Sequence, residues 1–267
     1  MEGDYAAANA GCAQLLFDSQ LLFGQLARRL RSEPNGRLVE NPHVLRQFPV
    51  DRLEVLEMEG LDVNPGVLAE VGRVRGLRHL QLAGTDLDDD SLKNFKDLTN
   101  LEWFGASETL IKGPGLIHLA NCKKLRCLSF SGNSLLPGTT RYFLQFPNLQ
   151  QLFIRHSLIT DADLVHVAKI KTLSDLALAS NNGITDSGMK YVAAIPRLSL
   201  LWLQETNVTL RGVALLRQLP LVGLSLSHSF DNAHDKALLK KMFPRCDIDV
   251  SQHITAEGND AMNYINP

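Results

Sequence analysis

A spaced pattern of leucines returns along most of this chain and limits the folds that are open to it. Each unit carries Leu-x-x-Leu-x-Leu, or close apolar substitutes, and successive units begin 24 residues apart, with one step of 25 and one of 23. The units begin at Leu53, Leu77, Leu101, Leu125, Leu149, Leu173, Leu198 and Leu221. A repeat of this length is typical of stacked architectures, in which each unit buries its apolar face against its neighbours.

Each unit predicts a strand, a turn and a helix in that order. Alternating anchors such as Leu176 and Leu178 fit a strand, whereas the spacing by three of Leu164, Val167 and Ile170 fits one face of a helix. In two units the tripeptide Ile-Thr-Asp stands between these patterns. A side-chain oxygen at that point can cap the free amide groups of the coming helix.

A column of small polar residues follows the strands. We expect these side chains to bond buried backbone groups in the loop, because water cannot reach that part of the chain. The column consists of Thr85, Thr109, Asn133, Ser157, Asn181, Thr206 and Ser229.

These features resemble leucine-rich repeats. The similarity is to the class written L-x-x-L-x-L-x-x-T/N-x-I-T-D-x-G-L, known from cysteine-containing repeats of ubiquitin-ligase adaptors and from many bacterial repeat proteins. Gly188 and Gly212 match its glycine, and Cys122 stands where its cysteine would be. The resemblance covers about Leu53 to Val250 and implies an α/β fold, a right-handed solenoid or horseshoe with a parallel concave sheet and helices on the convex side. It implies a binding scaffold, whose partners differ between members.

The repeats divide the chain into four parts. Residues 51–232 hold eight leucine-rich repeats, and residues 1–50 are predicted to form an N-terminal capping helix and half repeat. Residues 233–250 are predicted as a C-terminal cap with a last helix and a closing strand, and residues 251–267 as a polar tail. Apolar residues between about 6 and 31 follow a helical rhythm, so we expect that helix to cover the open end of the core. Binding of a partner or of a membrane surface is the alternative role for it.

The composition of the chain argues against some classes of partner. The chain has 27 basic and 29 acidic residues and a net charge of −2, so it has no bulk attraction to a phosphate backbone and nucleic acid is not the expected partner. No apolar stretch is long enough to cross a bilayer, so we expect no membrane insertion. The sequence begins without an export signal, and its four cysteines lack metal-type spacing. Free thiols indicate a reducing compartment, and we expect the cytoplasm.

No catalytic set is visible in the sequence. It contains no glycine-rich phosphate loop and no nucleophile elbow, so we predict that the chain is not an enzyme and needs no cofactor. His228, Asp231, His234 and Asp235 could ligate a metal, and Asp88 to Asp90 could ligate calcium. Helix caps and solvated side chains explain both groups as well, so we predict no metal site.

The candidate binding site follows from the predicted architecture. Parallel strands lie about 4.8 Å apart and packed helices about 8 to 10 Å apart, so the strands line the inside of the curve. Residues between the anchors then stand on the concave surface. Both tryptophans of the chain fall there. The candidate ligand-binding residues are His79, Trp103, Phe153, Arg155, His156, Leu200, Trp202 and Gln204.

Two explanations of the aromatic residues remain open at this point. Aromatic packing between strands stabilises a sheet without any ligand. Aromatic residues and arginine are also enriched at binding hot spots. We therefore predict an interaction module that binds a protein or peptide on the concave face. A carbohydrate-binding module is the alternative, because flat exposed aromatic rings also suit sugar faces. The sequence leaves the oligomeric state open.

Overall fold

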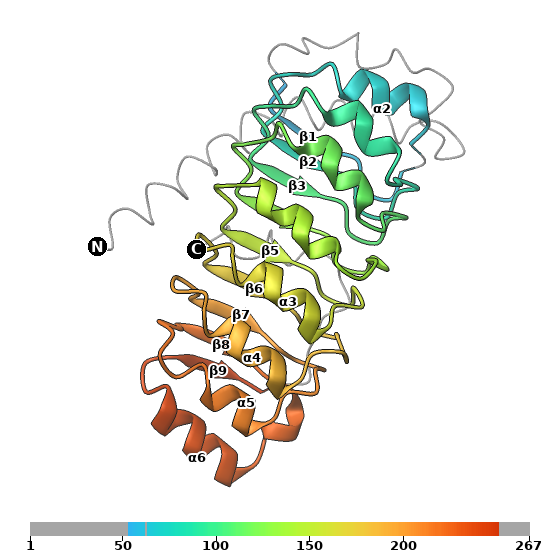
Figure 1. Ribbon diagram of the computed structural model, residues 1–267. Coiled ribbons are helices and arrows are strands. Elements are labelled where there is room, and N and C mark those ends of the chain that lie inside the picture. The colour runs from blue at the N-terminus through green and yellow to red at the C-terminus, as the bar shows by residue number, and fades with distance from the viewer. Residues whose placement is uncertain (1–52, 62, 251–267) are drawn as a thin grey trace.

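The computed structural model describes residues 53–61 and 63–250, and the regions predicted at 1–50 and 251–267 lie outside them. The described part contains one sheet of nine parallel strands in the order of the sequence (Figure 1). The strands are Val55–Glu57 (β1), His79–Gln81 (β2), Trp103–Gly105 (β3), Cys127–Ser129 (β4), Gln151–Phe153 (β5), Asp175–Ala177 (β6), Leu200–Trp202 (β7), Gly223–Ser225 (β8) and Asp247–Asp249 (β9). The eight strands predicted at the leucine anchors are confirmed.

The strands pair without any slip in register. Leu56 of β1 lies beside Leu80 of β2, and Leu80 lies beside Phe104 of β3. The same relation holds through to β8 and β9. Equivalent repeat positions therefore form straight columns across the sheet, and the central residue of each three-residue strand faces the core.

The helices lie together on one side of the sheet (Figure 1). They are Pro65–Val71 (α2), Ser91–Phe95 (η3), Pro114–Leu119 (η4), Thr139–Gln145 (η5), Asp161–Val167 (α3), Asp186–Val192 (α4), Leu210–Ala214 (α5), His228–Phe230 (η6) and Ala233–Met242 (α6). Those marked η are 3₁₀ helices. The apolar spacing predicted helices at η3 to η5 without separating the two types.

The main core lies between the sheet and the helices. In its central part the ring centroids of Phe95 and Phe104 are 6.0 Å apart, those of Phe104 and Phe130 are 5.8 Å apart, and both pairs meet edge to face. Cys122 is buried in this core, whereas Cys127 belongs to a second apolar cluster on the other face of the sheet. Cys122 and Cys127 therefore lie on opposite faces of the sheet, and both are free thiols.

Polar side chains bond the buried backbone of the loops, as predicted. Asn181 is a clear case, because its Oδ1 accepts from the backbone N–H groups of Ser157 and Ile159 at 2.9 and 3.0 Å, and its Nδ2 donates to the carbonyl of Ile154 at 2.9 Å. Ser229 is the exception. It lies exposed on η6, where no buried loop needs its hydroxyl.

The repeated Ile-Thr-Asp has two roles in the structure. Thr185 caps α4, as predicted, by accepting from the N–H of Ser187 at 3.2 Å. Asp161 of the preceding repeat bonds the backbone N–H of Thr185 at 2.9 Å and its hydroxyl at 2.6 Å. A Cβ at Gly188 would lie 2.2 Å from Oδ1 of Asp161. The glycine of the motif therefore makes room for the aspartate of the neighbouring repeat.

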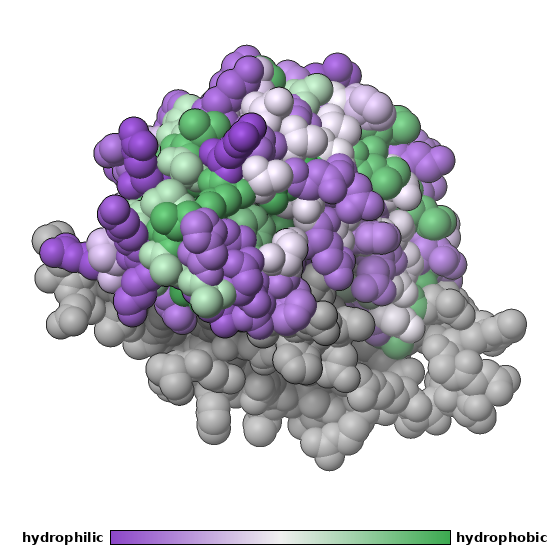
Figure 2. All heavy atoms as spheres, turned by 90° about the horizontal axis from the view of Figure 1, so that it is seen from below, coloured by the Kyte–Doolittle hydropathy of each residue, from purple (hydrophilic) through white to green (hydrophobic). Residues whose placement is uncertain are grey.

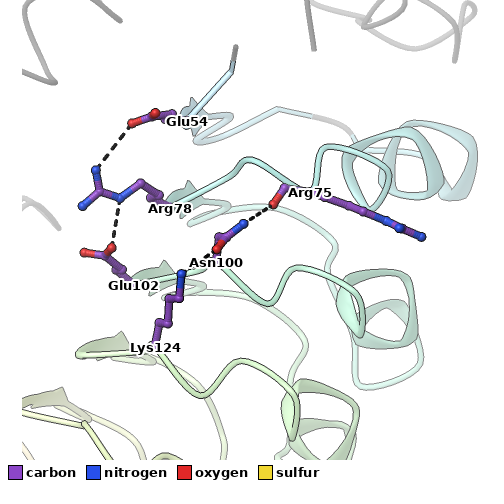
Figure 3. A network of polar contacts seen from close by, with 6 residues as sticks. All are labelled: Glu54, Arg75, Arg78, Asn100, Glu102 and Lys124. Carbon is purple, nitrogen blue, oxygen red and sulfur yellow. Dashed lines mark hydrogen bonds and ion pairs between the residues drawn. The ribbon is translucent and has the colours of Figure 1, made fainter. Parts of the chain in front are cut away.

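A polar network joins the first repeats at the edge where the strands begin (Figure 3). Nε of Arg78 donates to Oε1 of Glu102 at 2.9 Å, and its Nη1 lies 3.5 Å from Oε2 of Glu54. Nearby, Asn100 donates to the carbonyl of Arg75 at 2.9 Å and accepts from Nζ of Lys124 at 2.7 Å. These contacts tie together the turns that precede β1 to β4.

The last repeat ends in β9 and α6. Figure 2 looks at this end of the molecule, where an apolar area lies among hydrophilic side chains. Met242, Ile248 and Val250 are partly buried and pack against the main core. Within the described residues, α6 and β9 thus cover this end of the core in part.

Candidate functional site

The sheet face opposite the helices carries a second apolar cluster. It consists of Cys127, Phe153, Ala177, Ala179 and Trp202, with Trp103 and Leu200 packed against it. These residues stand on either side of the buried strand centres, as predicted for the concave face. We call this group the concave cluster.

The centre of the concave cluster is an aromatic pair with a cation. The rings of Phe153 on β5 and Trp202 on β7 have centroids 6.2 Å apart and are tilted by 50°. They approach each other across Ala177 of β6, whose small side chain belongs to the same cluster. Cζ of Arg155 lies 5.7 Å from the centroid of the Trp202 ring, which is within the range of a cation–π contact.

A second aromatic pair lies nearer to the N-terminal end of the sheet. The rings of His79 on β2 and Trp103 on β3 are stacked, with centroids 4.1 Å apart and planes 3° apart. A Cβ at Gly105 would lie 2.0 Å from Oε1 of Gln81 and 2.2 Å from Cη2 of Trp103. The space beside Gly105 is therefore not open, because the indole and the amide fill it.

Burial shifts the pKa values of ionisable groups at this end of the face. Burial lowers the pKa of His79 to about 4, so its ring is neutral at pH 7. Its Nε2 lies 3.8 Å from Oε1 of Glu57 on the neighbouring strand. Burial, and then the charge of Glu59, raise the pKa of the Glu57 carboxyl. The edge of the face at β1 is therefore acidic and crowded.

The middle of the face holds a buried carboxyl beside a thiol. Asp175 on β6 accepts from Nε2 of Gln151 at 2.5 Å, and burial raises the pKa of its carboxyl. Burial, and then the nearby Asp175, raise the pKa of the Cys127 thiol well above its usual value. A protonated thiol is a poor nucleophile, so these groups suit packing and hydrogen bonding rather than covalent chemistry.

The structure sorts the predicted site residues into groups. It brings Phe153, Arg155, Leu200 and Trp202 into or against the concave cluster, and His79 pairs with Trp103. His156 lies apart on the turn after β5, exposed and with a φ of 46°. Gln204 follows β7, and its Oε1 is buried without a hydrogen-bond partner. Sequence reasoning did not select Glu57, Gln81, Cys127, Gln151 and Asp175, although they occupy the same columns.

The two groups considered for metals are engaged in local contacts. Asp231 forms an ion pair with Lys236, and its Oδ2 lies 3.5 Å from Nδ1 of His228. Asp88 accepts from the N–H of Ser91 at 2.8 Å, as expected for the start of a helix. Among residues 53–61 and 63–250, no cluster of three or more histidine, cysteine or acidic side chains is placed to hold a metal ion.

No helix in the described ranges is both long enough and apolar enough to cross a bilayer.

Known proteins resemble this chain in structure. No protein-family model and no curated protein matches its sequence. Internalin C2 from Listeria monocytogenes superposes with a TM-score of 0.52 at 21% identity, over 66% of this chain and 72% of that one. A leucine-rich-repeat protein from Leptospira interrogans superposes with a TM-score of 0.51 at 19% identity, over 74% of this chain and 49% of that one. With its parallel sheet and regular repeat, the chain therefore has the leucine-rich-repeat fold.

Proposed function

We propose that this chain is a non-enzymatic interaction module that holds a protein or peptide partner on its concave face. The observation that carries the proposal is the concave cluster, which gathers Phe153, Trp202 and a guanidinium group on the sheet face away from the described helices. Aromatic residues and arginine carry much of the binding energy at protein interfaces. Curved repeat proteins also present such a face as an extended surface.

The geometry of the rings favours a protein partner over a sugar. A flat sugar face needs an exposed ring plane, and the planes of Phe153 and Trp202 are tilted by 50° to each other. Trp103 has one face stacked on His79. A glycan array tests the carbohydrate alternative directly, because sugar hits without any protein partner would favour it.

A pull-down from lysate with identification by mass spectrometry, followed by titration of the purified partner, tests the proposal. We expect Trp202→Ala to weaken binding by about 30-fold, which corresponds to about 2 kcal/mol. Leu215→Ala is the matched control, since this leucine is 49% exposed and follows α5 on the other side of the sheet. Full affinity of the Trp202→Ala variant would contradict binding at the concave cluster.

Stability measurements keep this test interpretable. Leu201 faces the main core, so Leu201→Ala is expected to lower the free energy of unfolding by about 2 to 5 kcal/mol. Trp202 faces the other way but is only 7% exposed, so its loss is expected to cost about 3 to 5 kcal/mol as well. Thermal melts of both variants beside the binding assay separate loss of affinity from loss of fold.

We also propose that the protein acts in the cytoplasm with a protein partner and not with nucleic acid. The free thiols Cys122, Cys127 and Cys246 and the small net charge support this. Cell fractionation followed by thiol labelling tests the location. Recovery of the protein outside the cytoplasm would contradict it.

A further inference from the structure

The concave face has a second end whose chemistry differs from that of the concave cluster. Glu57 on β1 and Glu59 just after it are two residues apart and therefore stand on the same side of the strand. On the neighbouring β2, Gln81 lies beside Glu57 in the same column, and His79 lies beside Val55 on the same face. We call these four residues the acidic end.

The two carboxylates have no cationic partner among the described residues. His79 is the nearest basic group to Glu57, but its lowered pKa leaves it neutral at pH 7. Glu59 accepts a hydrogen bond from Nε2 of Gln81 at 2.6 Å, and an amide carries no charge. The repulsion between the two carboxylates, which contributes to the raised pKa of Glu57, is therefore not balanced within the described chain.

An unpaired acceptor lies beside these carboxylates. Gln81 is only 8% exposed, and its Oε1 is buried without a hydrogen-bond partner. The amide is held over Gly105, because a Cβ there would lie 2.0 Å from that oxygen. Buried polar atoms in folded proteins are bonded as a rule, so an orphaned acceptor next to two carboxylates indicates a donor that comes from outside residues 53–61 and 63–250.

We propose that the acidic end is a subsite for a basic side chain, arginine or lysine, of the peptide that occupies the concave face. The inference rests on the proposed function and adds the class of ligand. Positive charge complements Glu57 and Glu59, and an arginine has enough N–H donors to reach both a carboxylate and Oε1 of Gln81.

The distance between the acidic end and the concave cluster sets the length of the bound peptide segment. β1 and β5 are separated by four strand intervals, or about 19 Å along the sheet. An extended peptide spans that distance in about six residues. The partner segment therefore carries its basic residue about six positions from an aromatic or aliphatic residue that meets Phe153 and Trp202.

The probe is a displayed library of random peptides. Each peptide is about 16 residues long, so that it can reach both the acidic end and the concave cluster. Selection on the wild-type chain is expected to enrich peptides with arginine or lysine about six residues from an apolar side chain. Replacing that arginine by citrulline, its neutral isostere, should weaken a selected peptide about tenfold.

Two variants with the same change in charge locate the effect. In Glu57→Gln/Glu59→Gln the arginine and citrulline peptides should bind about equally, because the charge complement is gone. In Asp97→Asn/Glu108→Gln, which removes two exposed carboxylates elsewhere, the tenfold preference should remain. Thermal melts confirm that both variants are folded.

The outcomes separate this inference from the proposed function. Enriched peptides without a basic residue, or a preference that survives in Glu57→Gln/Glu59→Gln, would overturn the basic subsite and leave peptide binding intact. If the wild-type chain enriches no peptide at all, peptide binding itself is overturned, and the subsite with it.

Discussion

Residues 77–148 and residues 149–220 repeat the same leucine pattern and yet form different helices. The first set, which we call the 3₁₀ repeats, contains η3, η4 and η5, and the second set, the α repeats, contains α3, α4 and α5. Each helix of the α repeats follows a threonine in extended conformation. The hydroxyls of Thr185 and Thr209 accept from the first turn, and Thr160 forms a capping box with Asp163. The 3₁₀ helices follow Asp90, Gly113 and Gly138, which make no side-chain cap bond. In such short helices, the capping side chain separates an α turn from a 3₁₀ turn.

The repeats of η4 and η5 satisfy free amide groups with carboxylates from neighbouring repeats, whereas Asp88 does this locally for η3. Asp89 accepts from the N–H groups of Lys112, Gly113 and Gly115 at 3.0, 2.9 and 2.7 Å. Asp163 of the first α repeat bonds the N–H of Gly138 at 2.9 Å. Both sets thus use an aspartate of a neighbouring unit, as Asp161 does at Thr185, and the α repeats add a threonine at the start of the helix.

Removal of Asp89 is expected to have the largest effect. Asp89→Ala leaves three backbone N–H groups without their acceptor, and we expect the free energy of unfolding to fall by about 3 kcal/mol. Urea denaturation measures this. Asp90→Ala is the control, since its exposed ion pair with Lys93 contributes less than about 1 kcal/mol. Equal effects of the two changes would contradict the role given to Asp89.

Substitution of Gly188 in the α repeats is expected to have the second largest effect on stability. Gly188→Ala places a methyl group 2.2 Å from Oδ1 of Asp161, so the carboxylate must move away from Thr185. We expect a loss of about 2 kcal/mol in the free energy of unfolding. The preceding residue, Ser187, is exposed, and Ser187→Ala should change stability little. A neutral Gly188→Ala would mean that the contact between the repeats can relax.

Loss of the helix cap at Thr185 is expected to lower the free energy of unfolding by a smaller amount. Thr185→Ala removes the acceptor for the N–H of Ser187 and the hydroxyl bonded to Asp161, and should cost about 1 kcal/mol. Thr185→Ser keeps the hydroxyl and should restore most of the stability. Chemical-shift changes at Asp186–Val192 would report whether α4 turns into a 3₁₀ helix in the alanine variant. An unchanged α4 would contradict the idea that the cap selects the helix type.

The sequence predicted the period, the strands and the faces of this fold, because these depend on where apolar residues recur. The type of helix was not predicted, although Lys112-Gly113 and Leu136-Pro137 stand where two other units have Thr-Asp, and this substitution was the available signal. At the candidate site, the face of each aromatic residue was predicted. How the rings lie was not, because this depends on neighbours such as Gly105 and Ala177 that decide where a large ring can settle.

The smallest effect is expected from acid, and the two sets of repeats should differ in their response to it. His79, in the 3₁₀ repeats, has a pKa of about 4 in the folded chain and about 6.5 when unfolded. As the pH falls, the unfolded chain takes up this proton first, so stability is lost on the acid side. Between pH 7 and pH 6 the loss through His79 is about 0.7 kcal/mol. Asp175, in the α repeats, has a raised pKa and therefore acts in the opposite direction.

His79→Phe isolates this effect, because phenylalanine can keep the stack on Trp103 but cannot take up a proton. The free energy of unfolding of the wild type, measured by urea denaturation at pH 7 and pH 6, should fall by about 0.7 kcal/mol more than that of the variant. Hydrogen exchange with mass spectrometry, corrected for the intrinsic exchange rate, should place the weakening in the 3₁₀ repeats around β2 and β3. If wild type and variant respond alike, the lowered pKa of His79 is contradicted. Its ring would then take up a proton beside Glu57 as the pH falls below about 6.5, and the acidic end would hold a counter-charge of its own in that range.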